Sequence, residues 1–496
     1  MFLLFAAIIL FILGKACYRL YFHPLRSFPG PKLAAITTLY EAYFAVIKDG
    51  QFIWEIGRLH DKYGPIVRIT PDELHIRDAS FYNEIYSGGS RVTEKPKSYV
   101  RIFGVPESMV ATVDHNHHHL RRKILNKYFS KRSISDVQPL IQEKIETLMQ
   151  HFRKAHGDQN IINLYVGFSA LTGDIISNYA YGTDYCFLRD ISRSNEIKEA
   201  AEAFGSFGHI LKLLPFDMPR LRCIPSKVME KISPAAARVV RLHEKIGQQS
   251  KLVMSSKQTM SPPHTVFEAL IDPSLPAEER TLDRLQDEGF VLLGAGTETT
   301  SWALTVTMFY LLSNQELFYQ LHEELKTVMP QPTDTPNLST LEALSLLRAV
   351  VHEGLRLSFG VLTRLPRVAP LDALNYKGHI IPPGTPVSET TYFIHMDRHY
   401  FPDPHTFNPR RWLGTAEERR NLESMIVSFS KGSRQCLGIN LAYAELFLTL
   451  ATLVRRFELK LIDTTLDDVE PYRDHFLIVP KNGQTGVKVL VTQEYA

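Results

Sequence analysis

Cysteine is scarce in this chain. Its 496 residues include only four, at Cys17, Cys186, Cys223 and Cys436. Small secreted domains that depend on disulfides are far denser in cysteine, so a disulfide scaffold is excluded and a reducing compartment is expected. A strong charge excess is also missing, because 56 basic residues stand against 53 acidic ones. Nucleic-acid-binding domains carry a clear basic excess, so we expect no nucleic-acid partner.

Long apolar runs are missing as well, with one exception at the N-terminus, where Phe2 to Leu13 is continuously apolar. A bilayer span needs about 20 residues, which this segment reaches if Lys15 and Arg19 extend their charges to the interface. No basic residue precedes the run and no small-residue cleavage site follows it, which disfavours a cleaved signal peptide. We therefore predict a single transmembrane helix as membrane anchor over 1–22. The basic residues after it predict that the rest of the chain is cytosolic.

In the remainder of the chain, the pattern of apolar, proline and glycine residues differs from one region to the next. Three prolines in segment 23–36 cannot continue a helix, so a stiff proline-rich spacer is predicted before a catalytic domain at 37–496. Apolar residues follow helical spacing from 138 to 325, whereas short β-like runs alternate with Pro and Gly turns from 361 to 409. The expected fold class is mainly α with a small β component.

The strongest chemical signal surrounds Cys436. In the segment FSKGSRQCLG, Phe429, Arg434, Cys436 and Gly438 stand directly before a long helical pattern. Glycines allow a tight turn whose backbone N–H groups can hold a thiolate, and the positive end of the following helix favours thiolate over thiol. Without its neighbours, however, a lone cysteine of this kind is more often buried and inert.

Three further segments decide between these interpretations. They are AGTETT at 295–300, EGLR at 353–356 and FNPRRW at 407–412. Together with the Cys436 segment, and in this order, they resemble the motifs of the cytochrome P450 superfamily. The chain is similar to microsomal members, in particular to fungal secondary-metabolism members near trichodiene oxygenase. The resemblance extends from about Tyr21 to the C-terminus.

The resemblance implies a cytochrome P450 fold and a haem b cofactor whose iron is ligated by the thiolate of Cys436. It implies further haem contacts by Ala295, His118, Arg122, Arg367, Phe429, Arg434 and Gly438. A buried structural triad behind the haem is implied for Glu353, Arg356 and Arg411.

Two of these assignments have rivals. His118 stands where the family more often has tryptophan, and His115 and His119, four residues apart, also suggest a metal site. No acidic or cysteine partner completes a ligand set nearby, so we favour a solvated or propionate-facing cluster. Arg364 competes with Arg367 for contact with the second propionate.

Glu298 and Thr299 are implied as catalytic residues, because an acid and an alcohol side by side can relay protons. The expected reaction is that of a haem-thiolate monooxygenase, which inserts one oxygen atom from O₂ into a lipophilic small molecule by hydroxylation or epoxidation. Fungal secondary-metabolite biosynthesis, of a terpenoid or polyketide, is the expected context. The alternatives are a haem-thiolate isomerase or dehydratase and a non-catalytic haem-binding protein.

The sequence also predicts the partners of the protein, which are a reductase and membrane lipid. The chain has no dinucleotide fingerprint, so electrons are expected from NADPH through NADPH–cytochrome P450 reductase at the endoplasmic reticulum membrane. Membrane lipid is the second expected partner, and Leu213 to Ile224 is predicted to dip into its surface. A basic run is interpreted either as the reductase-docking face or as a solvated face: Arg121, Lys123, Lys127, Lys131 and Arg132.

The resemblance also predicts which stretches line the substrate cavity. They are Arg101–Thr112, Phe204–Leu214, Phe290–Ala295, Phe359–Leu362 and His475–Leu477, and their mostly apolar or aromatic side chains suit a lipophilic molecule.

Overall fold

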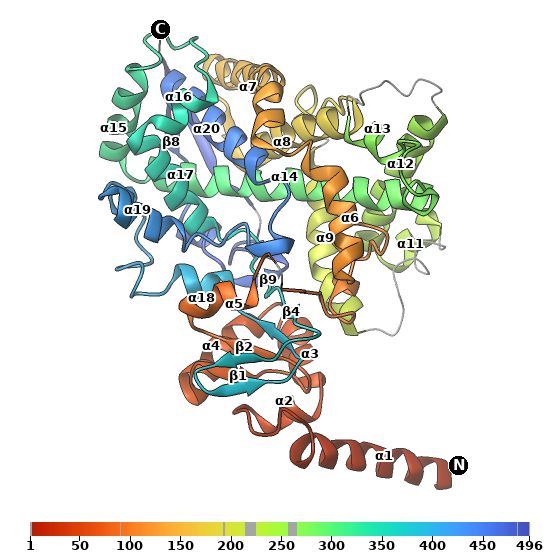
Figure 1. The fold of residues 1–496 in the computed structure, drawn as a ribbon. Helices are drawn as coiled ribbons and strands as arrows, with labels where there is room; N and C mark the ends of the chain where they lie inside the picture. The colour runs from red at the N-terminus through yellow and green to blue at the C-terminus, as the bar shows by residue number, and fades with distance from the viewer. Residues whose placement is uncertain are drawn as a thin grey trace.

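The computed structural model describes residues 2–89, 91–191, 194–213, 225–255, 265–483 and 485–495. Most of them lie in a large helical part, and a smaller part towards the N-terminus contains a four-stranded sheet (Figure 1). The predicted fold class, mainly α with a small β component, is confirmed.

Helix α14 (Leu282–Leu312) is the central element of the helical part, which it crosses from side to side (Figure 1). It is apolar on most of its faces, as expected for a helix that neighbours cover all round. Helix α8 (Leu164–Tyr181) packs along it. A Cβ atom on Gly296 would lie 2.7 Å from Cγ1 of Ile176 on α8, so glycine is needed for this close approach.

The other helices of this part surround α14. They are α6 (His115–Asn126), α7 (Lys131–Asp158), α9 (Ser194–Leu213), α11 (Ser226–Ile232), α12 (Pro234–Ser255), α13 (Val266–Leu270), α15 (Gln315–Lys326), α16 (Leu338–Ala343), α17 (Ser345–Ser358), α19 (Ala416–Glu423) and α20 (Ile439–Arg456). An antiparallel sheet joins β3 (Ile161–Asn163), β11 (Lys488–Glu494) and β8 (Phe457–Leu461), and β9 (Arg473–His475) forms a hairpin with β10 (Leu477–Val479).

The smaller part is built on the four-stranded sheet. Its strand order is β1 (Ile66–Arg68), β2 (Leu74–Ile76), β7 (Pro386–Ser388) and β4 (Arg367–Val368), with β2 and β7 parallel and the other pairs antiparallel. The hairpin of β5 (Leu374–Tyr376) and β6 (His379–Ile381) accompanies it. Short helices complete this region: α2 (Lys32–Ile36), α3 (Leu39–Ala42), α4 (Phe52–Tyr63), α5 (Tyr82–Ile85) and α18 (Thr391–His395).

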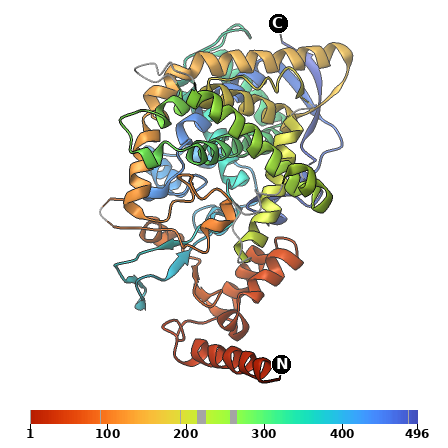
Figure 2. The same cartoon turned by 90° about the vertical axis from the view of Figure 1, so that its right-hand side faces the viewer.

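The N-terminal helix α1 (Phe2–Tyr21) lies at the edge of the molecule in both views (Figures 1 and 2). It is long and apolar enough to cross a membrane, and none of its residues is buried. The segment predicted as a spacer, 23–36, packs against the small sheet, where Leu25 and Phe28 are buried beside Ile66 and Leu74. The segment predicted to dip into the membrane surface lies outside the described residues, apart from Leu213 at the end of α9.

Candidate active site

A cavity of about 360 Å³ lies between α14, α20 and the loop that precedes α6. All five stretches predicted to line the substrate cavity contribute to its wall. Among the lining side chains, Phe103, Phe204, Phe290 and Phe476 form a chain of ring contacts with centroids 5.7 to 6.3 Å apart. The wall is therefore largely aromatic and apolar on this side, which favours a lipophilic ligand.

Cys436 opens into this cavity from the loop before α20, and its side chain is exposed to the cavity space. The loop is held by a hydrogen bond of 2.9 Å from Cys436 N to the carbonyl oxygen of Phe429. Gly432 adopts a φ of +72°, and a Cβ atom there would lie 2.2 Å from the carbonyl oxygen of Ser87, so only glycine fits. Gly438 is the N-cap residue of α20.

The protonation of Cys436 is governed by opposing influences. Burial raises the pKa of the thiol, while the Gly438 backbone N–H and the Arg122 guanidinium lower it. The predicted stabilisation by the start of α20 is thus present but outweighed by burial. A bound metal ion deprotonates a coordinating thiol, so this sulfur suits a site in which a metal supplies the missing positive charge.

Five basic side chains face the same cavity: Lys95, His118, Arg122, Arg367 and Arg434. Four of them were predicted as haem contacts, and Lys95 was missed because it belongs to no motif. Within the described residues, none of the lysine and arginine side chains among them forms an ion pair with a carboxylate. Instead they donate to backbone oxygens, for example from Lys95 Nζ to Val110 over 2.6 Å and from Arg434 Nη1 to Thr112 over 2.6 Å.

The positive charges of this basic cluster repel one another. Burial and the neighbouring cations hold the pKa of Lys95 well below its usual value and lower that of His118 to about 2. Burial lowers the pKa of Arg434 to about 10, and its buried Nε atom has no hydrogen-bond partner. A dianionic group in the cavity would relieve this repulsion, so these residues fit a haem, which carries two propionates and an iron that a thiolate can ligate.

Arg364, the alternative to Arg367, is paired with carboxylates and does not line the cavity. The Arg364 guanidinium donates to Glu41 and Glu73, each over 2.8 Å, and all three side chains are buried. These two carboxylates raise the pKa of Arg364 and neutralise its charge inside the smaller part. Arg367, in contrast, lines the cavity and stacks over the ring of Tyr86.

The predicted acid–alcohol pair lies on α14 where the helix borders the cavity. The Thr299 hydroxyl donates to the carbonyl oxygen of Ala295 over 2.8 Å, and both residues line the cavity. Glu298 is 1% exposed, and its carboxylate accepts a hydrogen bond from the hydroxyl of Tyr165 on α8. Sequence patterns missed Tyr165, because only the packing of α8 on α14 brings it to the acid.

The three residues of the predicted triad contact one another, with Glu353 and Arg356 buried and Arg411 half-buried. Both oxygens of Glu353 accept from Arg356, at 2.8 and 2.9 Å, and one also accepts from Arg411 Nε at 3.1 Å. Trp412 Nε1 donates to the same carboxylate over 2.9 Å. This single carboxylate therefore joins α17 to the FNPRRW segment.

The basic run needs one correction. Arg121 is 3% exposed and pairs with Glu279 over 2.9 Å, so it turns into the protein and is no part of a docking face. Lys123, Lys127, Lys131 and Arg132 are exposed, although Lys131 pairs with Glu342. The alternative metal site at His115 and His119 has no support among the described residues, which contain no group of three potential ligands.

Comparisons with known proteins agree with this geometry. The family model for cytochrome P450 matches residues 37–487. The chain is 46% identical over 493 residues to conidiogenone synthase PchP450 of Penicillium rubens, covering 99% of each chain. It is 41% identical to cytochrome P450 monooxygenase TRI4 of Fusarium sporotrichioides, covering 98% of this chain and 95% of that one. The crystal structure of a cytochrome P450 (CYP102L1) matches 89% of this chain with a TM-score of 0.71 at 18% identity, which supports the fold.

The chain belongs to the cytochrome P450 family. It is a cytochrome P450 monooxygenase, and the family implies a thiolate-ligated haem iron and electrons from a redox partner. The predicted family, its fold and the class of enzyme are thereby confirmed.

Proposed function

We propose that Cys436 provides the thiolate ligand of haem b in an enzyme that oxygenates a lipophilic fungal secondary metabolite. The observation that carries this proposal is the Cys436 sulfur in a cavity that four otherwise unpaired cations border. Relatives named conidiogenone synthase and monooxygenase TRI4, both fungal, support secondary-metabolite biosynthesis with a terpenoid or polyketide substrate.

In this proposal the cavity's basic residues hold the two propionates. Arg434 would use its free Nε, and the other basic side chains that would bind the propionates are Arg122, Arg367, His118 and Lys95. Phe429 shields the sulfur, Gly438 donates its backbone N–H to it, and Ala295 leaves space beside the iron. The triad of Glu353, Arg356 and Arg411 keeps the segment behind the haem in position.

When bound, haem supplies the binding and reductive cleavage of O₂. Thr299 lies at the cavity, where its hydroxyl donates its only proton to the Ala295 carbonyl, and breaking that hydrogen bond would free the same proton for transfer. Glu298 is the proton source behind it, held by Tyr165. The aromatic wall of the cavity orients the substrate and excludes water.

The remaining partners follow from the surface. We propose that α1 anchors the protein in the endoplasmic reticulum membrane with the catalytic domain in the cytosol. NADPH–cytochrome P450 reductase then docks on the exposed basic residues Lys123, Lys127, Lys131 and Arg132 and delivers electrons from NADPH.

The carbon monoxide difference spectrum of the reduced protein tests the central assignment. Thiolate-ligated haem gives a strongly red-shifted Soret band, which we expect for the wild type and not for Cys436→Ala. Cys186→Ala is the matched control, because Cys186 is also a free cysteine but does not line the cavity. Folded wild-type protein without the band, or Cys436→Ala protein that keeps it, would refute the assignment.

A further inference from the structure

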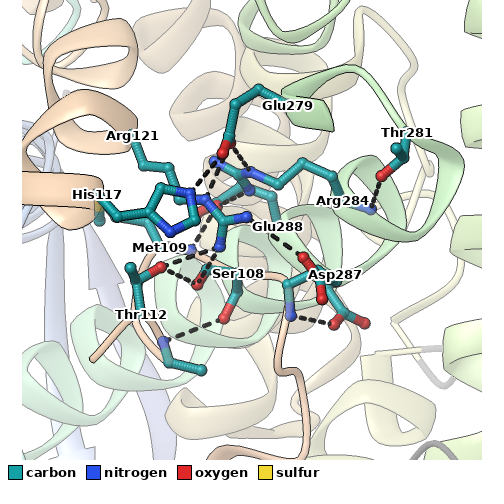
Figure 3. Close-up of polar contacts among 12 residues, drawn as sticks. Ser108, Met109, Thr112, His117, Arg121, Glu279, Thr281, Arg284, Asp287 and Glu288 are labelled. Carbon is teal, nitrogen blue, oxygen red and sulfur yellow. Dashed lines mark hydrogen bonds and ion pairs between the residues drawn. The ribbon is translucent and has the colours of Figure 1, made fainter. Parts of the chain in front are cut away.

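A buried cluster of charged side chains lies beside the cavity and is not used in the proposed reaction (Figure 3). It joins α6, the short 3₁₀ turn Ala277–Glu279 and the first turns of α14. Its five members are at most 3% exposed: Arg121, Glu279, Arg284, Asp287 and Glu288.

Four of these charges form a continuous chain, whereas Asp287 pairs with His243 on α12 over 3.0 Å. The Arg121 Nε atom lies 2.9 Å from a Glu279 oxygen, and the Arg284 Nε atom lies 3.3 Å from the same oxygen. Arg284 Nη1 then pairs with Glu288 Oε2 one helical turn along α14. Burying these charges costs free energy, because each loses its hydration. The further hydrogen bonds of the cluster show which part of the chain it stabilises.

The acids of the cluster hold the backbone of the cavity wall. Glu107 N donates to Asp287 Oδ2 over 2.9 Å, and Met109 N donates to Glu288 Oε2 over 2.8 Å. Arg121 Nη1 donates to the Thr112 hydroxyl over 3.0 Å. The wall segment, residues 105–113, forms neither helix nor strand. Side chains therefore satisfy backbone groups that regular structure satisfies elsewhere.

The basic cluster also holds the wall segment, because it donates hydrogen bonds to the backbone carbonyl oxygens of that segment. Val110 O accepts from Lys95, and Thr112 O accepts from Arg434, both over 2.6 Å. The wall segment is thus tied by its N–H groups to acids on α14 and by its C=O groups to Lys95 and Arg434, which line the cavity. Between these ties, Val105, Met109 and Val110 line the cavity.

We propose that Asp287 and Glu288 are specificity-determining positioning residues, which set the shape of the cavity by fixing the wall segment. The inference rests on the proposed function in so far as the cavity holds haem and substrate. A bulky ligand must fit against Met109 and Val110, whereas a small ligand at the iron does not reach them. The two acids would therefore affect the binding of a bulky ligand through the wall segment, although Glu288 also lines the cavity itself.

The hydrogen bonds of Glu288 suggest a sharp pair of variants. Oε2 accepts from both Met109 N and Arg284, whereas Oε1 has no partner. Glu288→Gln can keep an oxygen in the Oε2 position and so retain both bonds, whereas Glu288→Leu removes them. Thr281→Ala is a control for local weakening of α14, because Thr281 only caps the helix by accepting from Arg284 N.

The experiment uses the full-length holoprotein and two readouts. The first is amide hydrogen exchange of peptides that cover residues 105–113. We expect faster exchange in Glu288→Leu, and exchange like that of the wild type in Glu288→Gln and Thr281→Ala. The second is spectral titration of the haem with imidazole and with 1-(triphenylmethyl)imidazole. Glu288→Leu should change the ratio of the two dissociation constants about tenfold, whereas Glu288→Gln and Thr281→Ala leave it unchanged.

Each outcome decides the proposal. Exchange and affinity ratios in Glu288→Leu that equal those of the wild type overturn it, as does a change that Glu288→Gln or Thr281→Ala reproduces. If Glu288→Leu binds no haem, Asp287→Ala carries the same test, because it releases Glu107 N, together with His243 on α12, and leaves the Arg284–Glu288 pair intact. If neither variant binds haem, the cluster maintains the fold and not the wall, which also overturns the proposal. A wild type without the thiolate band would refute the proposed function, whereas the exchange readout would still test the wall.

Discussion

Two groups of charged side chains, the triad and the basic cluster, differ in how they are neutralised. In the triad, the Glu353 carboxylate satisfies Arg356 and Arg411 directly. Around the cavity, Lys95, Arg122, Arg367 and Arg434 donate to backbone oxygens and repel one another. The comparison indicates that the triad serves the folded chain itself, whereas the basic cluster is completed by an anionic ligand. Substitutions in the two groups should therefore affect different equilibria.

The largest effect is expected for Glu353→Ala. This change leaves Arg356 as an uncompensated buried cation, which costs about 3–5 kcal/mol of folding free energy. We expect a large loss of folded protein and a lower thermal midpoint, with or without haem, measured by circular dichroism. Glu417→Ala, an exposed acid on α19, is the control and should behave as the wild type. If Glu353→Ala were as stable as the wild type, the triad would have no structural role.

A smaller and different effect is expected for Lys95→Met. Removing one basic group from the cluster reduces repulsion in the haem-free protein, which offsets the lost hydrogen bond to Val110 O, so its stability should be unchanged or higher. The holoprotein loses a charge-assisted contact to a propionate, which should accelerate haem transfer to apomyoglobin about tenfold. Lys97→Met is the control on the same loop, because Lys97 is exposed. Haem transfer at the wild-type rate would remove Lys95 from the propionate site.

Exposed basic residues should affect the rate of electron transfer from the reductase and leave the folding stability unchanged. We expect the double variant Lys127→Glu and Lys131→Glu to slow reduction by the reductase several-fold at low salt, with unchanged haem content, and less at high salt. Stopped-flow reduction measures this rate. Lys251→Glu on α12, also exposed, changes the charge without altering the proposed docking face. Equal rates for the double variant and the wild type would favour a merely solvated face.

The smallest effect concerns a buried carboxyl group that keeps its proton in the folded protein. Both carboxylate oxygens of Glu389 lack hydrogen bonds, and burial raises the pKa of this group well above its usual value. The folded protein keeps this proton where the unfolded chain has lost it, so the stabilising contribution falls as pH rises from about 4.5 towards the raised pKa. Glu389→Gln should therefore unfold at higher urea than the wild type at about pH 8 and less so at about pH 5. A difference that does not depend on pH would contradict this assignment.

Sequence patterns predicted the site where its residues are close in the chain or belong to a motif with fixed spacing. The loop from Phe429 to Gly438 must turn tightly before a helix, so its chemistry follows from local geometry. The pair of Glu353 and Arg356 follows in the same way from helical periodicity. Tyr165 and Lys95 could not be found in this way, because their neighbours at the site come from distant segments of the chain.

The same distinction explains the misassigned and the undecided arginines. Arg121 belongs to a basic run that looks exposed in the sequence, yet Glu279 lies 158 residues away and turns it inward. Arg364 and Arg367 are equivalent in sequence, and only the positions of Glu41 and Glu73 separate them.

The amino-acid sequence by itself determined the family, the helical class and the apolar N-terminal helix, and it singled out Cys436 as the proposed ligand, because these depend on local spacing and composition. The tertiary structure alone decided which cations remain unpaired at the cavity and how Asp287 and Glu288 hold its wall. Those properties depend on burial and on contacts between distant segments, which set the electrostatic energy of each charge and are created only when the helices pack.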